Sequence, residues 1–246
     1  MIETAPTRVF ALLVILAVGI LGTGCSTAHH ARPLGKGNGA VHASIGGPVA
    51  GIGTADTPIP LTTVTGKVGV TDRLDVFAGW HVLETFLNDG NFYFDIGASY
   101  YIFDQKRFRP GLSAAFTVSP LINRESGWAS FDLQITASWA LDSRERHLIY
   151  VGMHNYFAPP RNQIVDMPPY TWSPYLGGQL RLGKKRRLGL TLELKWHRPY
   201  ASTRDSVVGY LGPGKQGALS FVSGITVYLG RDMKPAAEPE TYEGDE

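Results

Sequence analysis

Three histidines and one glutamate are the residues of this sequence that could do acid–base chemistry together. His81, His154 and His197 each lie a similar distance beyond a short polar turn, and Glu193 lies in the same segment as His197. An imidazole beside a hydroxyl, oriented by a carboxylate, activates a serine nucleophile, and converging imidazoles can hold Zn²⁺. No serine recurs at a fixed spacing from any of the three histidines. Whether these residues can activate a serine or bind Zn²⁺ therefore depends on how the secondary-structure elements position them.

Those elements alternate between apolar and polar side chains. In SFDLQITASWALD (130–142), Phe131 and Leu133 alternate with Asp132 and Gln134. A period of two is typical of β-strands, and the middle of the chain shows no convincing helical period. The pattern predicts ten strands, over residues 40–46, 61–70, 74–85, 92–103, 109–119, 129–141, 147–157, 171–182, 188–196 and 217–229.

Every second connection between the predicted strands is a short polar turn. These turns are at residues 71–73, 104–107, 142–146 and 183–187. The links between them are longer, which is typical of an up-and-down meander with two distinct ends. The barrels of bacterial outer membranes have this asymmetry, with an even number of strands, short turns at one end and longer loops at the other. We therefore predict an all-β fold: an up-and-down antiparallel β-barrel of about ten strands, with eight as the alternative, over residues 40–230.

The two faces of these strands differ in charge, and this difference indicates which face meets lipid. The apolar face, for example from Leu188 to Trp196, carries no charge. A charge there would cost about 2–4 kcal/mol at mid-depth in hydrocarbon. The polar face is rich in Gly, Ser, Thr and Tyr, whereas a face in bulk water would carry many more Lys and Glu. We expect a transmembrane barrel with a narrow, largely filled lumen, in which the few charges pair as a network. These charges are Lys67, Asp75, Asp95, Asp132, Arg181, Glu193 and Lys195.

Aromatic residues near the strand ends agree with a membrane-spanning barrel. Such residues form girdles where lipid meets water. The candidates are Trp80, Trp139, Trp172, Trp196 and Tyr100.

On this geometry the three histidines point into the lumen near its outer mouth. The strands of His81, His154 and His197 are not neighbours, so we do not expect the imidazoles to converge within about 2.1 Å of one metal ion. Histidines satisfied by lumen contacts are the preferred interpretation. We assign no catalytic residue, and these three histidines with Glu193 are the only candidates. We expect no metal and no other cofactor.

The beginning of the chain resembles a bacterial lipoprotein signal peptide. Arg8 precedes an apolar run, 9–21, that is too short to span a bilayer, and small residues lead to Cys25, the only cysteine. LGTGC, which ends at Cys25, resembles the lipobox, although its Leu21 stands one place further from the cysteine than usual. The resemblance implies a signal peptide over residues 1–24 and lipidation at Cys25. Ordinary cleavage behind STA (26–28) is the alternative.

Both ends of the mature chain are predicted to lie outside the barrel. Residues 25–39 are expected to form a linker, and 231–246 an acidic, disordered periplasmic tail with little to bury. The formal charge of +2 thus hides a basic barrel segment. Basic turns at 104–107, 142–146 and 183–187 either contact anionic lipid head groups or simply keep strand ends in water. Export argues against a nucleic-acid partner.

The last predicted strand resembles an assembly signal. SGITVYLG (223–230) places Ser223, Gly224, Val227 and Leu229 as in the C-terminal signal of outer-membrane proteins, although seventeen residues follow Leu229. Over residues 40–230 the chain is therefore similar to small bacterial outer-membrane β-barrel proteins. The resemblance implies the bacterial outer membrane as location, both termini in the periplasm, and membrane lipids and the assembly machinery as partners.

No motif identifies a specific activity or a specific partner. We expect a non-catalytic structural or interaction role in the cell envelope, with long loops at 158–170 and 199–216 as a binding surface. A lipid-modifying barrel enzyme, acting on lipid A or on phospholipid acyl chains, is the first alternative. A small channel is the second, and a soluble ligand-carrying barrel stays open.

Overall fold

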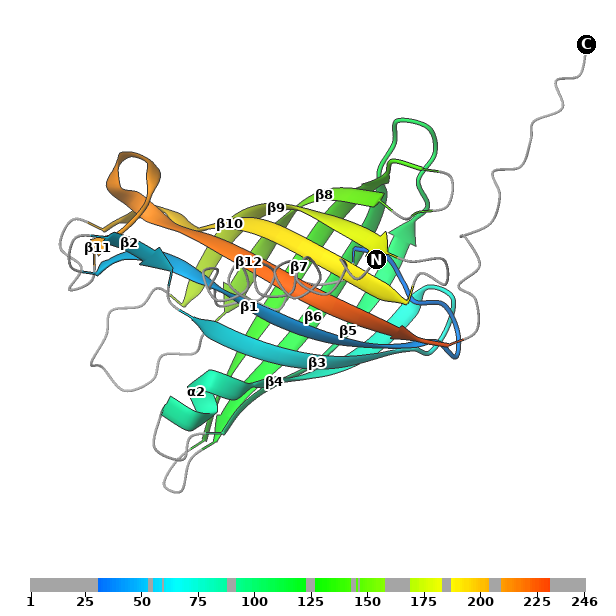
Figure 1. Cartoon of the computed structure of the whole chain (residues 1–246), viewed down its shortest axis with the longest axis horizontal. Helices are drawn as coiled ribbons and strands as arrows, with labels where there is room; N and C mark the ends of the chain where they lie inside the picture. The colour runs from blue at the N-terminus through cyan, green and yellow to red at the C-terminus, as the bar shows by residue number, and fades with distance from the viewer. Residues whose placement is uncertain are drawn as a thin grey trace, which may run out of the picture.

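Ten antiparallel strands close into a barrel in this computed structural model (Figure 1). The structure describes residues 31–52, 55–58, 60–87, 92–122, 127–142, 145, 147–157, 169–182, 187–203 and 209–230. The barrel strands are β1 (Gly39–Ile52), β3 (Leu61–Gly69), β4 (Leu74–His81), β5 (Phe92–Phe103), β6 (Gly111–Ile122), β7 (Gly127–Ala140), β8 (His147–Phe157), β9 (Tyr170–Leu182), β10 (Leu188–Ser202) and β12 (Gln216–Leu229). Each strand pairs with the next, and β1 pairs with both β3 and β12. The predicted all-β, ten-stranded, up-and-down barrel is confirmed.

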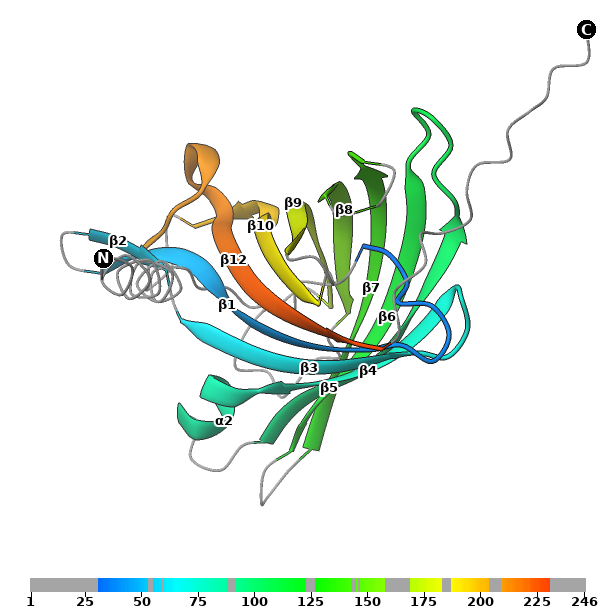
Figure 2. The same ribbon diagram turned by 45° about the vertical axis from the view of Figure 1, so that its right-hand side comes forward.

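The remaining elements lie at the end of the barrel opposite the short turns. They are β2 (Ala55–Pro58), β11 (Gly209–Tyr210), the short helix α2 (Val82–Leu87) and the 3₁₀ turn η1 (Pro213–Lys215). Both β2 and β11 pair with the far part of β1, which therefore extends well beyond the predicted strand. Figures 1 and 2 place α2 and β2 at one end and the first described residues, in dark blue, at the other.

One predicted strand ends early. Residues 74–85 were expected to be extended, but β4 stops at His81 and α2 follows. The Thr85 hydroxyl donates to the carbonyl of His81 at 2.7 Å and lies 3.0 Å from the indole Nε1 of Trp80, which donates to it. At the end of β4 these local hydrogen bonds take the place of further main-chain pairing between strands. Among the described residues, no helix has the length and apolar character needed to span a bilayer.

The polar face of the strands is inside the barrel and the apolar face is outside. Asp75 and Lys195 are 0% and 1% exposed, whereas Leu192 and Ile96 are 65% and 54% exposed. This confirms the predicted direction of the two faces. It contradicts the alternative of a soluble barrel, whose apolar side chains would share a dry centre.

Several aromatic side chains are anchored at the strand ends. The indole N–H of Trp139 donates to the carbonyl of Phe108 at the short-turn end. At the opposite end the indole of Trp196 donates to Gln216, and that of Trp80 donates to Thr85. Each ring thus keeps its polar atom bonded while its apolar body stays on the outer wall, which suits a position where lipid meets water.

Three predictions fall outside the described residues. They are the signal peptide over 1–24, the lipidation of Cys25 and the disordered tail over 231–246. They stay predictions.

Candidate functional site

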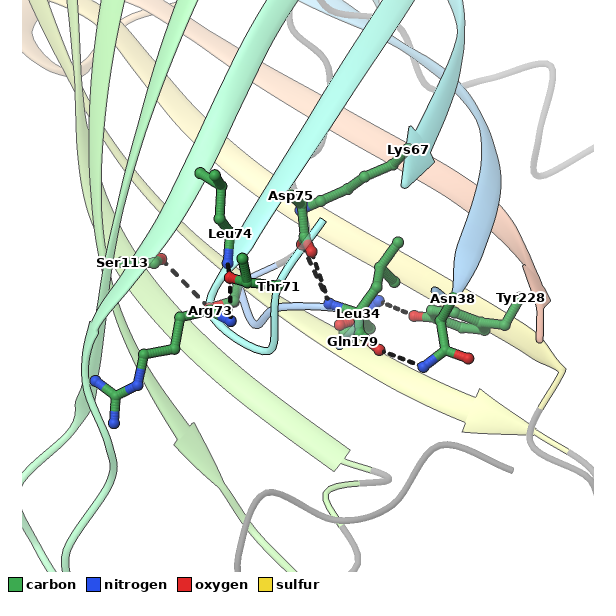
Figure 3. A network of polar contacts seen from close by, with 11 residues as sticks. Leu34, Asn38, Lys67, Thr71, Arg73, Leu74, Asp75, Ser113, Gln179 and Tyr228 are labelled. Atoms are coloured by element: carbon green, nitrogen blue, oxygen red, sulfur yellow. Dashed lines mark hydrogen bonds and ion pairs between the residues drawn. The ribbon is translucent and has the colours of Figure 1, made fainter. Parts of the chain in front are cut away.

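The segment before β1 packs inside the short-turn end of the barrel. Ala31, Arg32 and Leu34 are almost completely buried. The main-chain N–H of Leu34 donates to both carboxylate oxygens of Asp75, at 3.2 and 3.1 Å, and the Ser113 hydroxyl donates to the carbonyl of Ala31 at 3.3 Å (Figure 3). Residues 31–34 of the expected linker therefore lie inside the barrel, and Lys36 and Gly37, which are exposed, form the turn into β1.

Residues 31–34 reach opposite walls of the lumen. Ala31 packs with Tyr150 of β8 and Tyr175 of β9. Leu34 packs with Ala40 of β1 and Tyr228 of β12. Leu34 also donates its main-chain N–H to Asp75 of β4, which lies five strands away from β9 around the closed sheet, so the segment lies across the lumen. Apolar Leu34 within a polar, Gly-rich stretch was the one sequence signal that could have indicated this burial.

Arg32 ties the segment to two of the short turns. Its guanidinium donates to the carboxylate of Glu145 and to the side-chain carbonyl of Gln105. It also lies over the ring of Tyr101, with 5.7 Å between the guanidinium carbon and the ring centroid. The charge of Arg32 is thus paired although the side chain is buried, as buried charges require.

The buried pair of Lys67 and Asp75 holds the segment from the other side. Lys67 Nζ lies 3.0 Å from Asp75 Oδ2. The Asp75 carboxylate therefore accepts from an ammonium group and from the peptide N–H of Leu34 at once. Asn38 completes the turn into β1 by donating its side-chain amide to the carbonyl of Leu34 at 2.9 Å (Figure 3).

The other predicted lumen charges also lie inside the barrel and have polar partners. Asp95 accepts from the Ser119 hydroxyl at 2.6 Å and lies 2.9 Å from His81 Nε2. The Arg181 guanidinium carbon lies 4.7 Å from the centroid of the Tyr228 ring. The hydroxyl of Tyr228 accepts a hydrogen bond from the side-chain amide of Gln179 at 2.5 Å (Figure 3).

A larger group of charges lies between β7, β8 and β10. His154 Nε2 lies 3.3 Å from Asp132 Oδ1, and His154 Nδ1 lies 3.4 Å from Lys195 Nζ. Lys195 is also 3.7 Å from the carboxylate of Glu193, which accepts from the Tyr150 hydroxyl at 3.1 Å. The structure thus brings Asp132, Glu193 and Lys195 together around His154.

Among the described residues, no nucleophile is placed beside His154. Ser173 lies opposite His154 in the β8–β9 ladder, but its hydroxyl accepts from the main-chain N–H of Arg198 at 3.4 Å. Both ring nitrogens of His154 face charged partners instead, Asp132 and Lys195. Neither nitrogen is placed to take a proton from a serine.

The candidate histidines do not form one site. His81 is held by Asp95, His154 by the group around Lys195, and His197 has a buried Nε2 without a hydrogen-bond partner among the described residues. Within the part of the chain that the structure describes, no group of three His, Cys, Asp or Glu side chains is arranged to hold a metal ion.

Two tyrosines and two glycines interlock on the inner wall. Tyr150 stands opposite Gly177, and Tyr175 stands opposite Gly152, in the β8–β9 ladder. A Cβ at Gly152 would lie 2.3 Å from the Tyr175 ring and 2.5 Å from the carbonyl oxygen of Ile135. Each glycine therefore provides the space that the opposite ring occupies.

We expect Gly152→Ala to lower the free energy of unfolding by about 1–3 kcal/mol, because the added methyl overpacks the wall. Urea unfolding in detergent micelles, followed by tryptophan fluorescence, measures it. Gly66→Ala is the matched control: a Cβ at Gly66 meets nothing within 4 Å, so this change should be neutral or slightly stabilising. Equal effects at the two positions would contradict the interlock.

The fold has neighbours among solved structures of outer-membrane proteins. The chain is similar to the NanC porin, at 10% identity and a TM-score of 0.43, over 78% of this chain and 98% of that one. It is similar to an outer membrane channel from Pseudomonas putida F1, at 10% and 0.46, over 83% and 100% of the two chains. It is also similar to the outer membrane protein OprG from Pseudomonas aeruginosa, at 8% and 0.34, over 82% and 100%. No family model and no curated protein sequence matches the chain. At these identities and TM-scores the likeness carries no argument about what this barrel binds.

Proposed function

We propose that the chain is an integral outer-membrane β-barrel with a structural or interaction role in the cell envelope, and that it neither catalyses a reaction nor conducts solutes. The observation that carries this proposal is the filled lumen. Ser130, Ser138, Ser220 and Thr226 belong to the polar face, yet each is 0% exposed. Buried side chains and residues 31–34 occupy the space that a channel would leave to water.

The outer wall supports the membrane part of the proposal. Its exposed side chains are apolar on every barrel strand, including Val64, Val76, Ile96, Phe116, Ile135, Val151, Leu176, Leu192 and Ile225. A monomeric soluble protein rarely exposes so large a continuous apolar surface. An apolar band around a barrel with a polar interior is the arrangement that lipid requires.

The two ends of the barrel strands support the proposed orientation. β1 begins and β12 ends at the short-turn end, where Gly39 pairs with Leu229. Short turns of outer-membrane barrels face the periplasm, so we place both termini there. Cys25 precedes Ala31 by six residues, which span at most about 20 Å when extended. An acyl anchor at Cys25 can therefore reach the bilayer beside the barrel while residues 31–34 stay inside it.

Conductance and lipid analysis test the proposal on the full chain. In planar bilayers we expect no discrete conductance steps, because the lumen is filled. A variant lacking residues 31–37 is the matched comparison. We expect brief conductance steps from it, because the side chains of β4, β8 and β9 that contact this segment then face an open lumen. Lasting steps from the full chain would favour a channel, and a mass shift of lipid A on expression would favour an enzyme.

A further inference from the structure

The β9–β10 ladder stops halfway along the two strands. Its last pair is Tyr175 with Lys195. Beyond it β9 continues over 170–174 and pairs with β8 alone, while β10 continues to Ser202 and pairs with β12 alone. The neighbouring β8–β9 ladder, by contrast, runs to the end of β8. The wall therefore has a seam here without main-chain pairing.

The local sequence explains this seam. Pro174 follows directly beyond the last pair and has no N–H to donate to a ladder, and Pro199 lacks one on the other strand. Between Lys195 and Pro199, Arg198 adopts a left-handed backbone with φ of 46°, and the register to β12 shifts after His197. Non-glycine residues in this region cost free energy and often mark functional positions.

Side chains close the seam in place of a ladder. The rings of Trp172 and Tyr200 meet across it with their centroids 5.5 Å apart. The N–H of Arg198 reaches the Ser173 hydroxyl at 3.4 Å, which is long for a hydrogen bond. These contacts are weaker than a run of ladder bonds, so the two strands can separate here at lower cost than elsewhere in the wall.

An apolar groove borders the seam on the outer wall. Its volume is about 570 Å³, and the residues that line it beside the seam are Pro174, Leu176, Leu194, Trp196 and Leu219. This volume lies within the range of about 300–1,000 Å³ that is usual for ligand sites. The lining side chains fit a hydrocarbon chain and offer nothing to a polar ligand.

Two side chains of β10 beside the seam, His197 and Arg198, each have a buried nitrogen atom. Among the described residues, His197 Nε2 and Arg198 Nε have no hydrogen-bond partner. Buried polar atoms usually have one. Arg198 Nε can only donate, and His197 Nε2 donates in the tautomer that carries its proton there, so an acceptor at this site would satisfy both atoms. The carboxylates of Asp132 and Glu193 contact His154 and Lys195.

We propose that the β9–β10 seam binds a membrane lipid with an anionic phosphate head group. Its hydrocarbon chain lies in the outer groove, and its head group enters between Trp172 and Tyr200 to accept from Arg198 and His197. This inference rests on the proposed position of the barrel in a membrane, which supplies such lipids at the outer wall.

Binding of labelled lipids to the purified full chain in detergent micelles tests the proposal. The probes are fluorescent phosphatidylglycerol and fluorescent phosphatidylcholine with identical chains. We expect phosphatidylglycerol to bind about tenfold more tightly, because the choline cation of phosphatidylcholine offsets the charge of the phosphate that both lipids share. Arg198→Gln should remove this preference, which corresponds to about 1.4 kcal/mol. Arg187→Gln, an exposed arginine at the opposite end of β10, should leave binding unchanged.

A second variant tests the groove independently of the charge. Leu194→Trp fills the groove and should weaken the binding of both lipids, whereas Leu190→Trp, on the same face of β10 but outside the groove, should not. Equal affinity for the two lipids, or competition by inorganic phosphate alone, would overturn the proposal. Mobility that shifts on heating shows separately that each variant is a folded barrel, so failure of the lipid site and failure of the membrane proposal give different results.

Discussion

Asp75→Ala is expected to lower the free energy of unfolding by about 3–5 kcal/mol. The substitution leaves the ammonium group of Lys67 buried without its counter-charge, and it removes the acceptor of the Leu34 N–H. Both losses fall on residues that hold the 31–34 segment across the lumen. Urea unfolding in micelles measures the change, and a parallel gel shows whether the heat-dependent mobility of the barrel persists.

Two matched variants separate the charge from the position. Asp104 forms an ion pair of the same type with Arg73, at 2.5 Å, but both side chains are nearly half exposed. Asp104→Ala should therefore cost at most about 1 kcal/mol. The double variant Lys67→Met with Asp75→Asn keeps an acceptor for Leu34 and removes both charges, so it should regain most of the lost stability. A loss at Asp75 no larger than the loss at Asp104 would show that the buried pair does not hold the segment.

Leu192→Arg is expected to destabilise the barrel in lipid vesicles by about 2–4 kcal/mol, which is the cost of a cation on the lipid face at mid-depth. Leu192 is the most exposed of the outward leucines on β10, at 65%. On a protein surrounded by water, a substitution at such an exposed position would have almost no effect. The effect of the substitution therefore distinguishes an outer wall in lipid from one in water. Equilibrium folding into vesicles measures the change in the free energy of unfolding.

Leu188→Arg is the control for depth. Leu188 faces outward on the same strand but lies at the short-turn end, next to Arg187. Near the interface the cost should fall to about 0–1 kcal/mol. If both arginines were tolerated equally well, the outer wall would not be wrapped by hydrocarbon, and the proposed location would be wrong.

The fold could be predicted from the sequence because its signals are local. Alternation along 130–142 and similar segments locates strands, and the alternation of short and long connections predicts an even meander. The prediction failed where a local contact decided the outcome, as at Thr85, whose hydroxyl bonds to His81 and ends β4. It was also too short for β1, because that strand extends through a local hairpin with β2 and through distant pairing with β11.

The candidate site was predictable in part. The direction of the charged lumen residues followed from alternation: six of the seven are buried, and Arg181, which is half-buried, lies over the ring of Tyr228. Their partners could not be read from the sequence, because a contact such as that of His154 with Lys195 depends on how β7 to β10 are staggered. The burial of residues 31–34 was missed for a related reason, since Leu34 meets Tyr228 only after β1 has paired with β12 and closed the barrel.

The sequence by itself determined which side of each barrel strand is polar, that about ten strands form the barrel, and that the first of them begins and the last ends on the short-turn side. These properties depend on the period of two and on the lengths of the connections. Both are set by residues that are close together along the chain. Only the tertiary structure decided that the segment before β1 lies across the lumen, that Tyr150 and Tyr175 occupy the space over opposite glycines, and that β9 and β10 separate beyond Lys195. Each of these depends on register around a closed sheet, where residues far apart in the sequence are brought within contact distance.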